Sequence, residues 1–152
     1  MIISPDSYLF TEDGTYLWSV PRVKAAWNSA RTEFQRVLSW PVKPSKVVLL
    51  MGMPASGKST WLAEHEDETV LYFDACLDLP WKREPFIKQA RAMGISVEVV
   101  WFCTPLEVCI ERNAARSPDR QVPADVIRAM ARKIASSPPT EGEGFALIRW
   151  EG

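Results

Sequence analysis

Apolar residues along this chain gather into short runs, separated by longer stretches in which apolar positions recur every three or four residues. The runs have the length of β-strands, and the central ones are apolar on both faces, as is typical of strands buried inside a parallel sheet. Strands are therefore predicted at 2–4, 46–51, 70–73, 96–102 and 145–150.

The stretches between the runs carry helix signals. Ser19 and Pro21 open a first helix, whose apolar residues continue at helical spacing to Val37. Another helix is predicted over 85–93, with proline in its first turn and Gly94 at its end.

Two further helices follow the strand at 96–102. Thr104 to Glu107 combines a capping box with proline at the first helical position, so a helix is predicted to begin there and to end near Asn113. Pro123 begins the next one. Strands that alternate with helices predict an α/β fold in three layers, with a parallel sheet covered by helices on both faces.

The 152 residues have the size of one domain, and the proline-rich stretch 41–45 is interpreted as a linker inside it. Hydrophobic residues at 47% and charged residues at 24% are ordinary for a soluble globular protein. The longest apolar stretch, 47–55, is far shorter than the ~18 residues of a membrane span. A secretory signal pattern is not visible either, so we expect no membrane partner and a cytoplasmic location.

The net charge of −1 bears on possible partners, because a protein that grips a long duplex is usually clearly basic. Here the basic residues concentrate between 111 and 133, which suits a nucleotide or a short strand end. The three cysteines form no C-x-x-C pair, which predicts free thiols, with Cys103 and Cys109 buried. His65 lies among acidic residues and is predicted to be a solvated surface side chain.

Residues 52–59 read G-x-x-x-x-G-K-S and directly follow an apolar run, which is the pattern of a phosphate-binding loop between a strand and a helix. Its glycines let successive N–H groups point at one phosphate, and the helix beginning near Gly57 adds its positive dipole end. Lys58 would reach the β- and γ-phosphates, and the Ser59 hydroxyl would help to hold Mg²⁺. An ordinary glycine-rich turn is the alternative. The residues predicted to bind ATP here are Gly52, Pro54, Ala55, Ser56, Gly57, Lys58, Ser59 and Thr60.

Several stretches resemble a known family of P-loop kinases. The sequences T-P-L-E at 104–107, E-R-N at 111–113 and Arg116 closely resemble the lid region of the polynucleotide 5′-hydroxyl kinases. The sequence D-A-C-L at 74–77 resembles the D-x-x-L strand end of that family. The sequence S-P-D-S-Y at 4–8 resembles its S-x-D-x-Y segment, which holds the catalytic aspartate.

The order of these segments differs from the family, in which the S-x-D-x-Y strand and its helix follow the phosphate loop. We interpret this as one strand–helix unit moved to the front, because a sheet can be connected in more than one order. The prediction is one P-loop kinase domain over 1–152 with a relocated unit at 1–40, the phosphate loop and its helix at 46–66, and a helical lid at 105–135. Leu9 replaces an arginine that the family uses on the acceptor, so acceptor recognition is expected to differ.

The resemblance implies roles for charged residues. Asp6 would be the general base that accepts the proton of the acceptor hydroxyl, or else an Asx-turn residue. Arg116 and Arg112, one helical turn apart, would stabilise the transferred phosphoryl group, or else form a solvated helix face. Arg120 would contact the nucleotide beside them. Asp74 would orient a magnesium-bound water, an arginine or the acceptor, or would only cap a helix.

Aromatic residues follow Asp6 in the chain. Tyr8 is a predicted acceptor contact, and with Phe10, Tyr16 and Trp18 it would flank an acceptor base by stacking. The predicted function is therefore transfer of the ATP γ-phosphate to the 5′-hydroxyl of a polynucleotide end. A kinase of a nucleoside, nucleotide or other small molecule is one alternative, and a nucleotide-dependent switch that hydrolyses ATP slowly is another.

Overall fold

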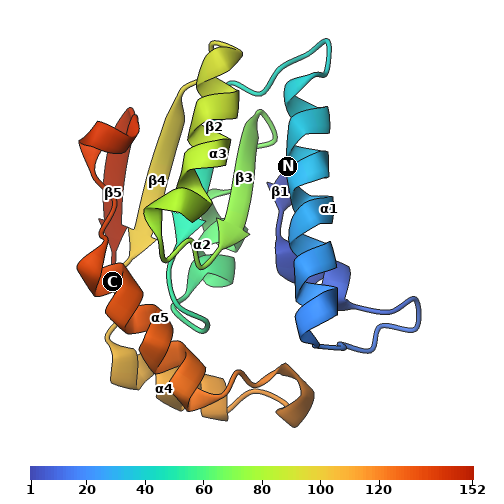
Figure 1. Cartoon of the computed structure of the whole chain (residues 1–152), viewed down its shortest axis with the longest axis vertical. Coiled ribbons are helices and arrows are strands. Elements are labelled where there is room, and N and C mark those ends of the chain that lie inside the picture. The colour runs from blue at the N-terminus through green and yellow to red at the C-terminus, as the bar shows by residue number, and fades with distance from the viewer.

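The five strands form one parallel sheet in a computed structural model that describes all residues, 1–152 (Figure 1). Their spatial order is β1-β3-β2-β4-β5, so consecutive strands are joined by crossovers. The predicted strands are confirmed with small shifts in their ends. Their bounds are Ile2–Ile3 for β1, Lys46–Met51 for β2, Val70–Ala75 for β3, Val97–Phe102 for β4 and Leu147–Glu151 for β5.

Five α-helices and three short 3₁₀ helices connect the strands. The α-helices are α1 (Val20–Leu38), α2 (Lys58–His65), α3 (Pro80–Ala92), α4 (Leu106–Ala114) and α5 (Ala124–Ser136). The 3₁₀ helices are η1 (Pro5–Leu9), η2 (Pro118–Arg120) and η3 (Glu141–Glu143). None of the helices has the length and apolar character that crossing a bilayer would require.

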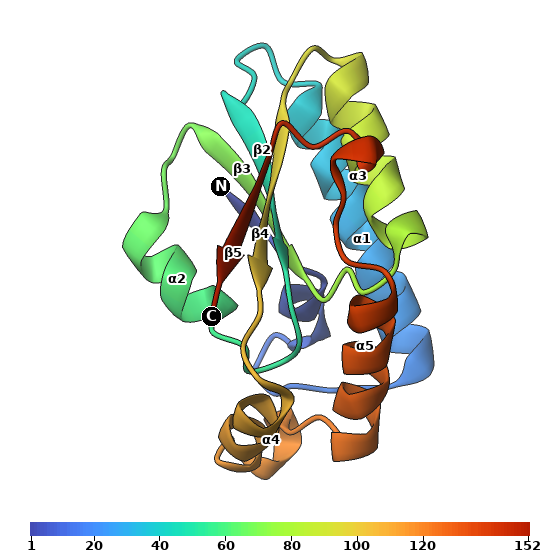
Figure 2. The ribbon, with the colours of Figure 1, turned by 90° about the vertical axis from the view of Figure 1, so that its left-hand side faces the viewer.

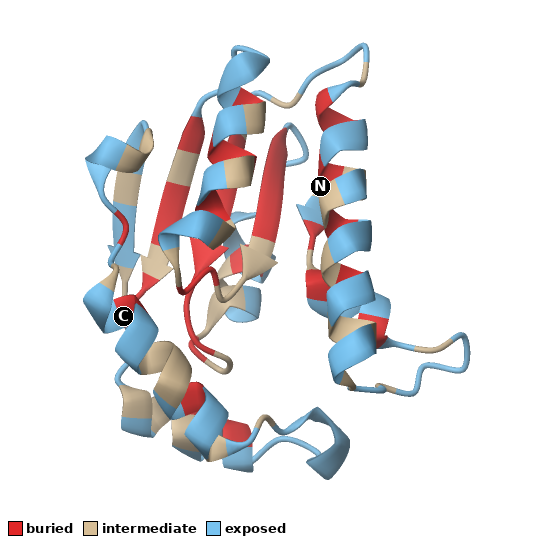
Figure 3. Ribbon diagram, in the orientation of Figure 1, coloured by how far each residue is buried: buried red, intermediate tan, exposed pale blue.

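The helices cover the two faces of the sheet unequally (Figure 2). Helices α1 and α3 lie on one face, where the larger core cluster of 22 buried residues is found. Helix α2 lies alone on the other face, over a cluster of 7 buried residues. The part of that face that α2 leaves open carries charge, including the ion pair between Lys46 and Glu98 at 3.1 Å. Figure 3 shows the result: the central strands are mostly buried, whereas the outer faces of the helices are exposed.

The front of the chain completes the sheet as its edge strand. Ile2 pairs with Tyr72 and Ile3 pairs with Phe73, both in parallel register. Helix α1 then packs on the larger core, where the Phe34 ring meets the ring of Phe73 at a centroid distance of 6.0 Å. Because all five strands are parallel, the segments that follow β1, β3, β2 and β4 emerge at the same edge of the sheet.

One predicted helix start and one predicted helix cap are wrong. Helix α3 begins at Pro80, and Pro85 lies inside it, where the Trp81 carbonyl loses its helical partner. Trp81 is 60% exposed, so water can take that carbonyl. The expected capping box at Thr104 does not form, because the Thr104 hydroxyl donates to the Ser56 carbonyl at 2.7 Å. A capping box occurs instead at Thr140, where η3 begins.

The cysteines are free, as predicted, but their exposure differs from the prediction for one of them. Cys109 is buried, whereas Cys103 is exposed because it follows the last residue of β4. His65 is exposed, as predicted, and its ring stacks on the Trp61 indole at a centroid distance of 4.3 Å.

Candidate phosphate-binding site

The loop between β2 and α2 folds tightly against the end of the neighbouring strand. A Cβ at Gly52 would lie 2.7 Å from Ser56 Oγ and 2.9 Å from Phe102 Cβ, so only glycine fits there without a shift. Ala55 and Gly57 have φ values of 62° and 104°, a left-handed backbone that turns the loop back toward α2.

Several donors of this loop have no partner within the chain. The backbone N–H groups of residues 57–60 find no acceptor, as expected for the first turn of a helix. The Ser56 hydroxyl is buried and also has no partner. A concave group of free donors at the positive end of a helix fits the oxygens of a phosphate chain.

The Lys58 ammonium lies across the same loop. Its Nζ donates to the carbonyls of Gly52 and Met53, each at 2.9 Å. Burial lowers the pKa of Lys58, and the negative charges of Asp74 and Asp6 oppose that effect. A phosphate in the loop would give this ammonium an anionic partner in place of neutral carbonyls.

Side chains of α4 and of the residues before it contact the phosphate loop. Besides the hydroxyl of Thr104 on Ser56, the Arg112 guanidinium lies 3.5 Å from the Ala55 carbonyl through Nη1. Arg112 is exposed, so its remaining donors are accessible. Sequence reasoning assigned Thr104 to a helix cap and missed its contact with the loop. The sequence did hold one signal for this contact. Thr104 follows closely after β4, at the edge of the sheet where the phosphate loop lies.

Two carboxylates come to this edge from neighbouring strands. Asp74 belongs to β3, and the exposed Asp6 follows β1 in η1. Burial raises the pKa of Asp74, the Lys58 charge lowers it, and the Asp6 charge raises it further. The sheet therefore brings Asp6, Asp74 and Lys58 close enough for their charges to interact, although they come from three separate segments of the chain.

The lid loop between α4 and α5 reaches toward the same place. Its base is closed by Asn113, which donates to the Val122 carbonyl at 2.7 Å and accepts from the Val122 N–H at 3.0 Å. The Arg120 guanidinium lies over the Phe10 ring at 5.1 Å. Burial raises the pKa of Tyr16, Asp6 raises it further, and Arg120 and Arg116 lower it. Tyr16, one of the aromatic residues predicted to flank an acceptor base, therefore lies close enough to Asp6, Arg116 and Arg120 for their charges to act on it.

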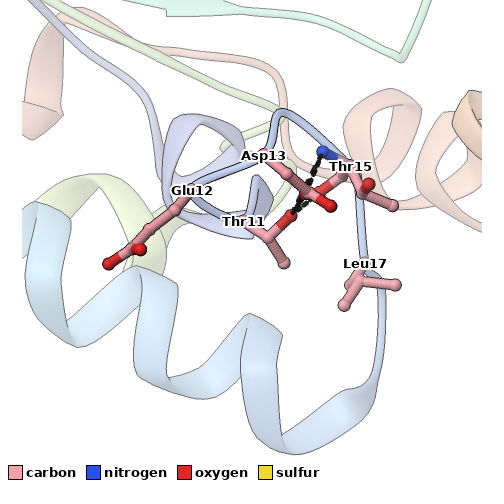
Figure 4. A pocket seen from close by; sticks show the side chains of 5 residues that line it. All are labelled: Thr11, Glu12, Asp13, Thr15 and Leu17. Atoms are coloured by element: carbon pink, nitrogen blue, oxygen red, sulfur yellow. Dashed lines mark hydrogen bonds between the residues drawn. The ribbon is translucent and has the colours of Figure 1, made fainter.

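Tyr8, a predicted acceptor contact, is 40% exposed and belongs to η1, which packs on α1. Burial and the Glu33 charge raise the pKa of Tyr8, and Arg36 lowers it. The segment that follows is a turn with a hollow beside it, lined by Thr11, Glu12, Asp13, Thr15 and Leu17 (Figure 4). Its polar groups bind one another, since the Thr15 N–H donates to Asp13 Oδ1 and to Thr11 Oγ1, each at 3.1 Å. The hollow is therefore the inside of a turn.

Cys76 is a further neighbour of the phosphate loop that sequence reasoning did not assign. Its carbonyl accepts from the Gly52 N–H at 3.3 Å. Burial and the nearby Asp78 carboxylate raise the pKa of its thiol to about 11, against the opposing charges of Lys58 and Lys82. The thiol therefore stays protonated at neutral pH, and its contribution to the site is packing.

The comparisons with known proteins agree with this class of fold. A family model described as an AAA domain matches residues 67–137, which run from β3 to the end of α5 and include Asp74 and the lid arginines. A search among curated proteins gives no match. The parallel sheet, the phosphate loop and the match together indicate a P-loop nucleotide-binding domain of the kinase or ATPase type.

Proposed function

We propose that this protein transfers the γ-phosphate of ATP to a hydroxyl acceptor, and that the acceptor is the 5′-hydroxyl of a polynucleotide end. One observation carries the proposal. The Asp6 carboxylate comes to the edge of the sheet where Lys58 and the phosphate loop lie, and the lid reaches across to the segment that follows Asp6. A switch protein needs the loop but has no need of a second, exposed carboxylate beside it.

The donor would be held by the free N–H groups of the loop, by Ser56 and by Lys58. The exposed Ser59 hydroxyl at the start of α2 would hold Mg²⁺, which neutralises phosphate charge when bound. Asp74, which faces Lys58 from β3, would orient a water of that ion or the acceptor.

Asp6 would accept the proton of the acceptor hydroxyl while the oxygen of that hydroxyl bonds to the γ-phosphorus. The bond from that phosphorus to the β–γ bridging oxygen breaks, and ADP leaves. Arg116 and Arg112 would stabilise the equatorial oxygens of the group in transit. Positioning and charge neutralisation supply most of the rate enhancement in such a transfer.

The segment that follows Asp6, where the acceptor would bind, has features that suit the end of a nucleic-acid strand. Leu9 is 2% exposed, so the position at which related kinases carry an arginine for the acceptor points into the core here. The Arg120 guanidinium lies over the Phe10 ring on the acceptor side, with Tyr16 edge-on to that ring at 5.2 Å. An arginine beside partly exposed aromatic rings suits one phosphate and one base of a single strand.

Two variants test the transfer reaction. Asp6→Asn should lower the rate of ³²P transfer from ATP to a 5′-hydroxyl oligonucleotide by about 10²- to 10⁴-fold, because the general base is lost. Its Kd for ATP should stay within about twofold of the wild type, since Asp6 does not bind the donor. Glu12→Gln is the matched control, because Glu12 is an exposed carboxylate of the same segment without a hydrogen bond, and it should transfer normally.

The outcomes separate the alternatives. Transfer that survives in Asp6→Asn would refute Asp6 as the base. Nucleosides that compete with the oligonucleotide at lower concentration would point to a small-molecule kinase, which the net charge of −1 and Leu9 favour. ATP hydrolysis that is unchanged in Asp6→Asn, with no acceptor labelled, would identify a switch protein.

A further inference from the structure

One buried arginine connects α3 with β2, with the end of α5 and with η3. Arg83 of α3 is fully buried, and its Nε and Nη2 donate to the two carboxylate oxygens of Glu143 at 2.7 and 3.2 Å. Its Nη2 also donates to the Ser137 carbonyl at 3.1 Å, just beyond the end of α5. Its Nη1 donates to the Leu77 carbonyl at 2.9 Å and contacts the sulfur of Met51 at 3.8 Å. The carboxyl end of α5 is therefore fixed against β2 and the β3–α3 loop.

One helical turn before Ser137, Lys133 of α5 approaches Asp78 without forming a hydrogen bond. Asp78, in the loop after β3, is 1% exposed, and its Oδ1 accepts from Lys82 at 2.5 Å. Its Oδ2 is buried and has no hydrogen-bond partner. The Lys133 ammonium of α5 lies 3.8 Å from that oxygen, too far for a hydrogen bond. A buried carboxylate oxygen without a partner is costly, so a movement that completes the contact is favoured.

We propose that Asp78 and Lys133 are a positioning pair that closes when the lid moves onto a bound nucleotide. Neither residue touches the nucleotide in this proposal, which rests on the proposed donor site. Asp78 lies next to Cys76, whose carbonyl holds the Gly52 N–H, so drawing Lys133 toward Asp78 draws α5 toward the phosphate loop.

The geometry of the helix amplifies the movement. Shortening the contact from 3.8 Å to a hydrogen bond moves Lys133 by about 1 Å. Lys133 is four residues from the fixed Ser137, or about 6 Å along the helix, whereas Ala124 is thirteen residues away, or about 20 Å. If the Lys133 side chain keeps its conformation, a rigid α5 turning about Ser137 shifts its first residue by about 3 Å, and the lid loop with Arg116 and Arg120 precedes that residue.

Limited trypsin digestion tests the pair, because the enzyme cleaves after the exposed Arg116 and Arg120. Mg²⁺ and ATP should slow these cleavages in the wild type, and Lys133→Met should lose most of that protection, with an apparent Kd for ATP about 5- to 30-fold higher. Arg132→Met is the matched control, since Arg132 is an exposed cation of the same helix with no ion pair, and it should behave as the wild type. Lys133→Arg should restore protection, which a general loss of helix stability would not allow.

Three results would overturn the positioning pair: protection in Lys133→Met equal to the wild type, equal loss in Arg132→Met, or no protection by ATP in the wild type. The proposed transfer reaction can fail separately. If ATP protects the lid in a Lys133-dependent way but no acceptor is phosphorylated, the pair stands and the transfer is wrong. If transfer occurs and Lys133→Met is normal in both assays, only the pair is wrong.

Discussion

Replacing Gly52 by alanine adds one methyl group at the most crowded point of the phosphate loop. The added Cβ would lie 2.7 Å from Ser56 Oγ and 2.9 Å from Phe102 Cβ. Ser56 is 3% exposed, so its side chain has little space to move away. Phe102 Cβ is attached directly to the backbone of β4, so relief there requires the strand itself to move.

Overpacking of this kind costs about 1–3 kcal/mol. A loss of 1 kcal/mol lowers Tm by about 2–4 °C in a domain of this size, so Gly52→Ala should melt about 2–12 °C below the wild type. Displacing Ser56 also disturbs the free donors of the loop, so the rise in Tm on adding Mg²⁺ and ATP should shrink. Differential scanning fluorimetry with and without nucleotide measures both effects.

Matched variants separate crowding from a general effect of alanine. Gly142→Ala is the control, because its Cβ would meet only Thr140 Oγ1 at 3.8 Å, an ordinary contact, and its Tm should stay within about 1 °C. Gly52→Ala/Ser56→Ala should recover only part of the loss, because the Phe102 contact remains. A Tm and an ATP response of Gly52→Ala equal to the wild type would refute the reasoning.

Three further predictions concern titration, thiol chemistry and the buried arginine. The raised pKa of Asp74 means that the folded state binds more protons than the unfolded state above the ordinary value of 3.8, so this residue costs stability as the pH rises through that interval. Asp74→Asn should therefore gain Tm relative to the wild type at pH 7 and lose the gain near pH 3, in melts across pH. Iodoacetamide should label the exposed Cys103 before Cys76, whose pKa of about 11 should make its labelling rise about tenfold per pH unit below that value, as followed by mass spectrometry. Glu143→Gln should cost about 3–5 kcal/mol in urea unfolding because it leaves the fully buried Arg83 without its carboxylate, whereas Glu84→Gln, at an exposed pair with Lys88, should cost less than about 1 kcal/mol.

The sequence predicted the sheet well because its strands are nearly uniform apolar runs with clear ends. The phosphate loop was equally readable, since a fixed pattern of glycine, lysine and serine directly follows β2. The start of α3 was misplaced because two prolines, Pro80 and Pro85, both fit a first turn, and only the packing of Arg83 and Phe86 decides between them.

The candidate site was only partly predictable, because its side chains come from distant segments. Nothing local to Thr104 distinguishes a helix cap from a brace on the phosphate loop. Tyr8 likewise feels the charges of Glu33 and Arg36 of α1, neighbours that the pattern around Tyr8 cannot reveal. The buried contacts of Arg83 and Asp78 depend on how α3 and the loop before it pack against η3 and the end of α5, which no spacing along the chain specifies.

The two-residue edge strand β1 has a consequence for how activity can be turned on and off. Ile2 pairs with Tyr72, seventy positions further along the chain, and this edge of the sheet holds only one more paired residue, Ile3, besides the backbone hydrogen bonds of Met1 with Val70 and Tyr72. Short terminal elements open at a lower free-energy cost than a central strand does. Local detachment of this segment would loosen the start of η1, which holds Asp6, while β2, β3 and β4 keep the phosphate loop in place. In the proposed reaction, such a molecule would keep the donor site but would hold its general base, Asp6, less firmly.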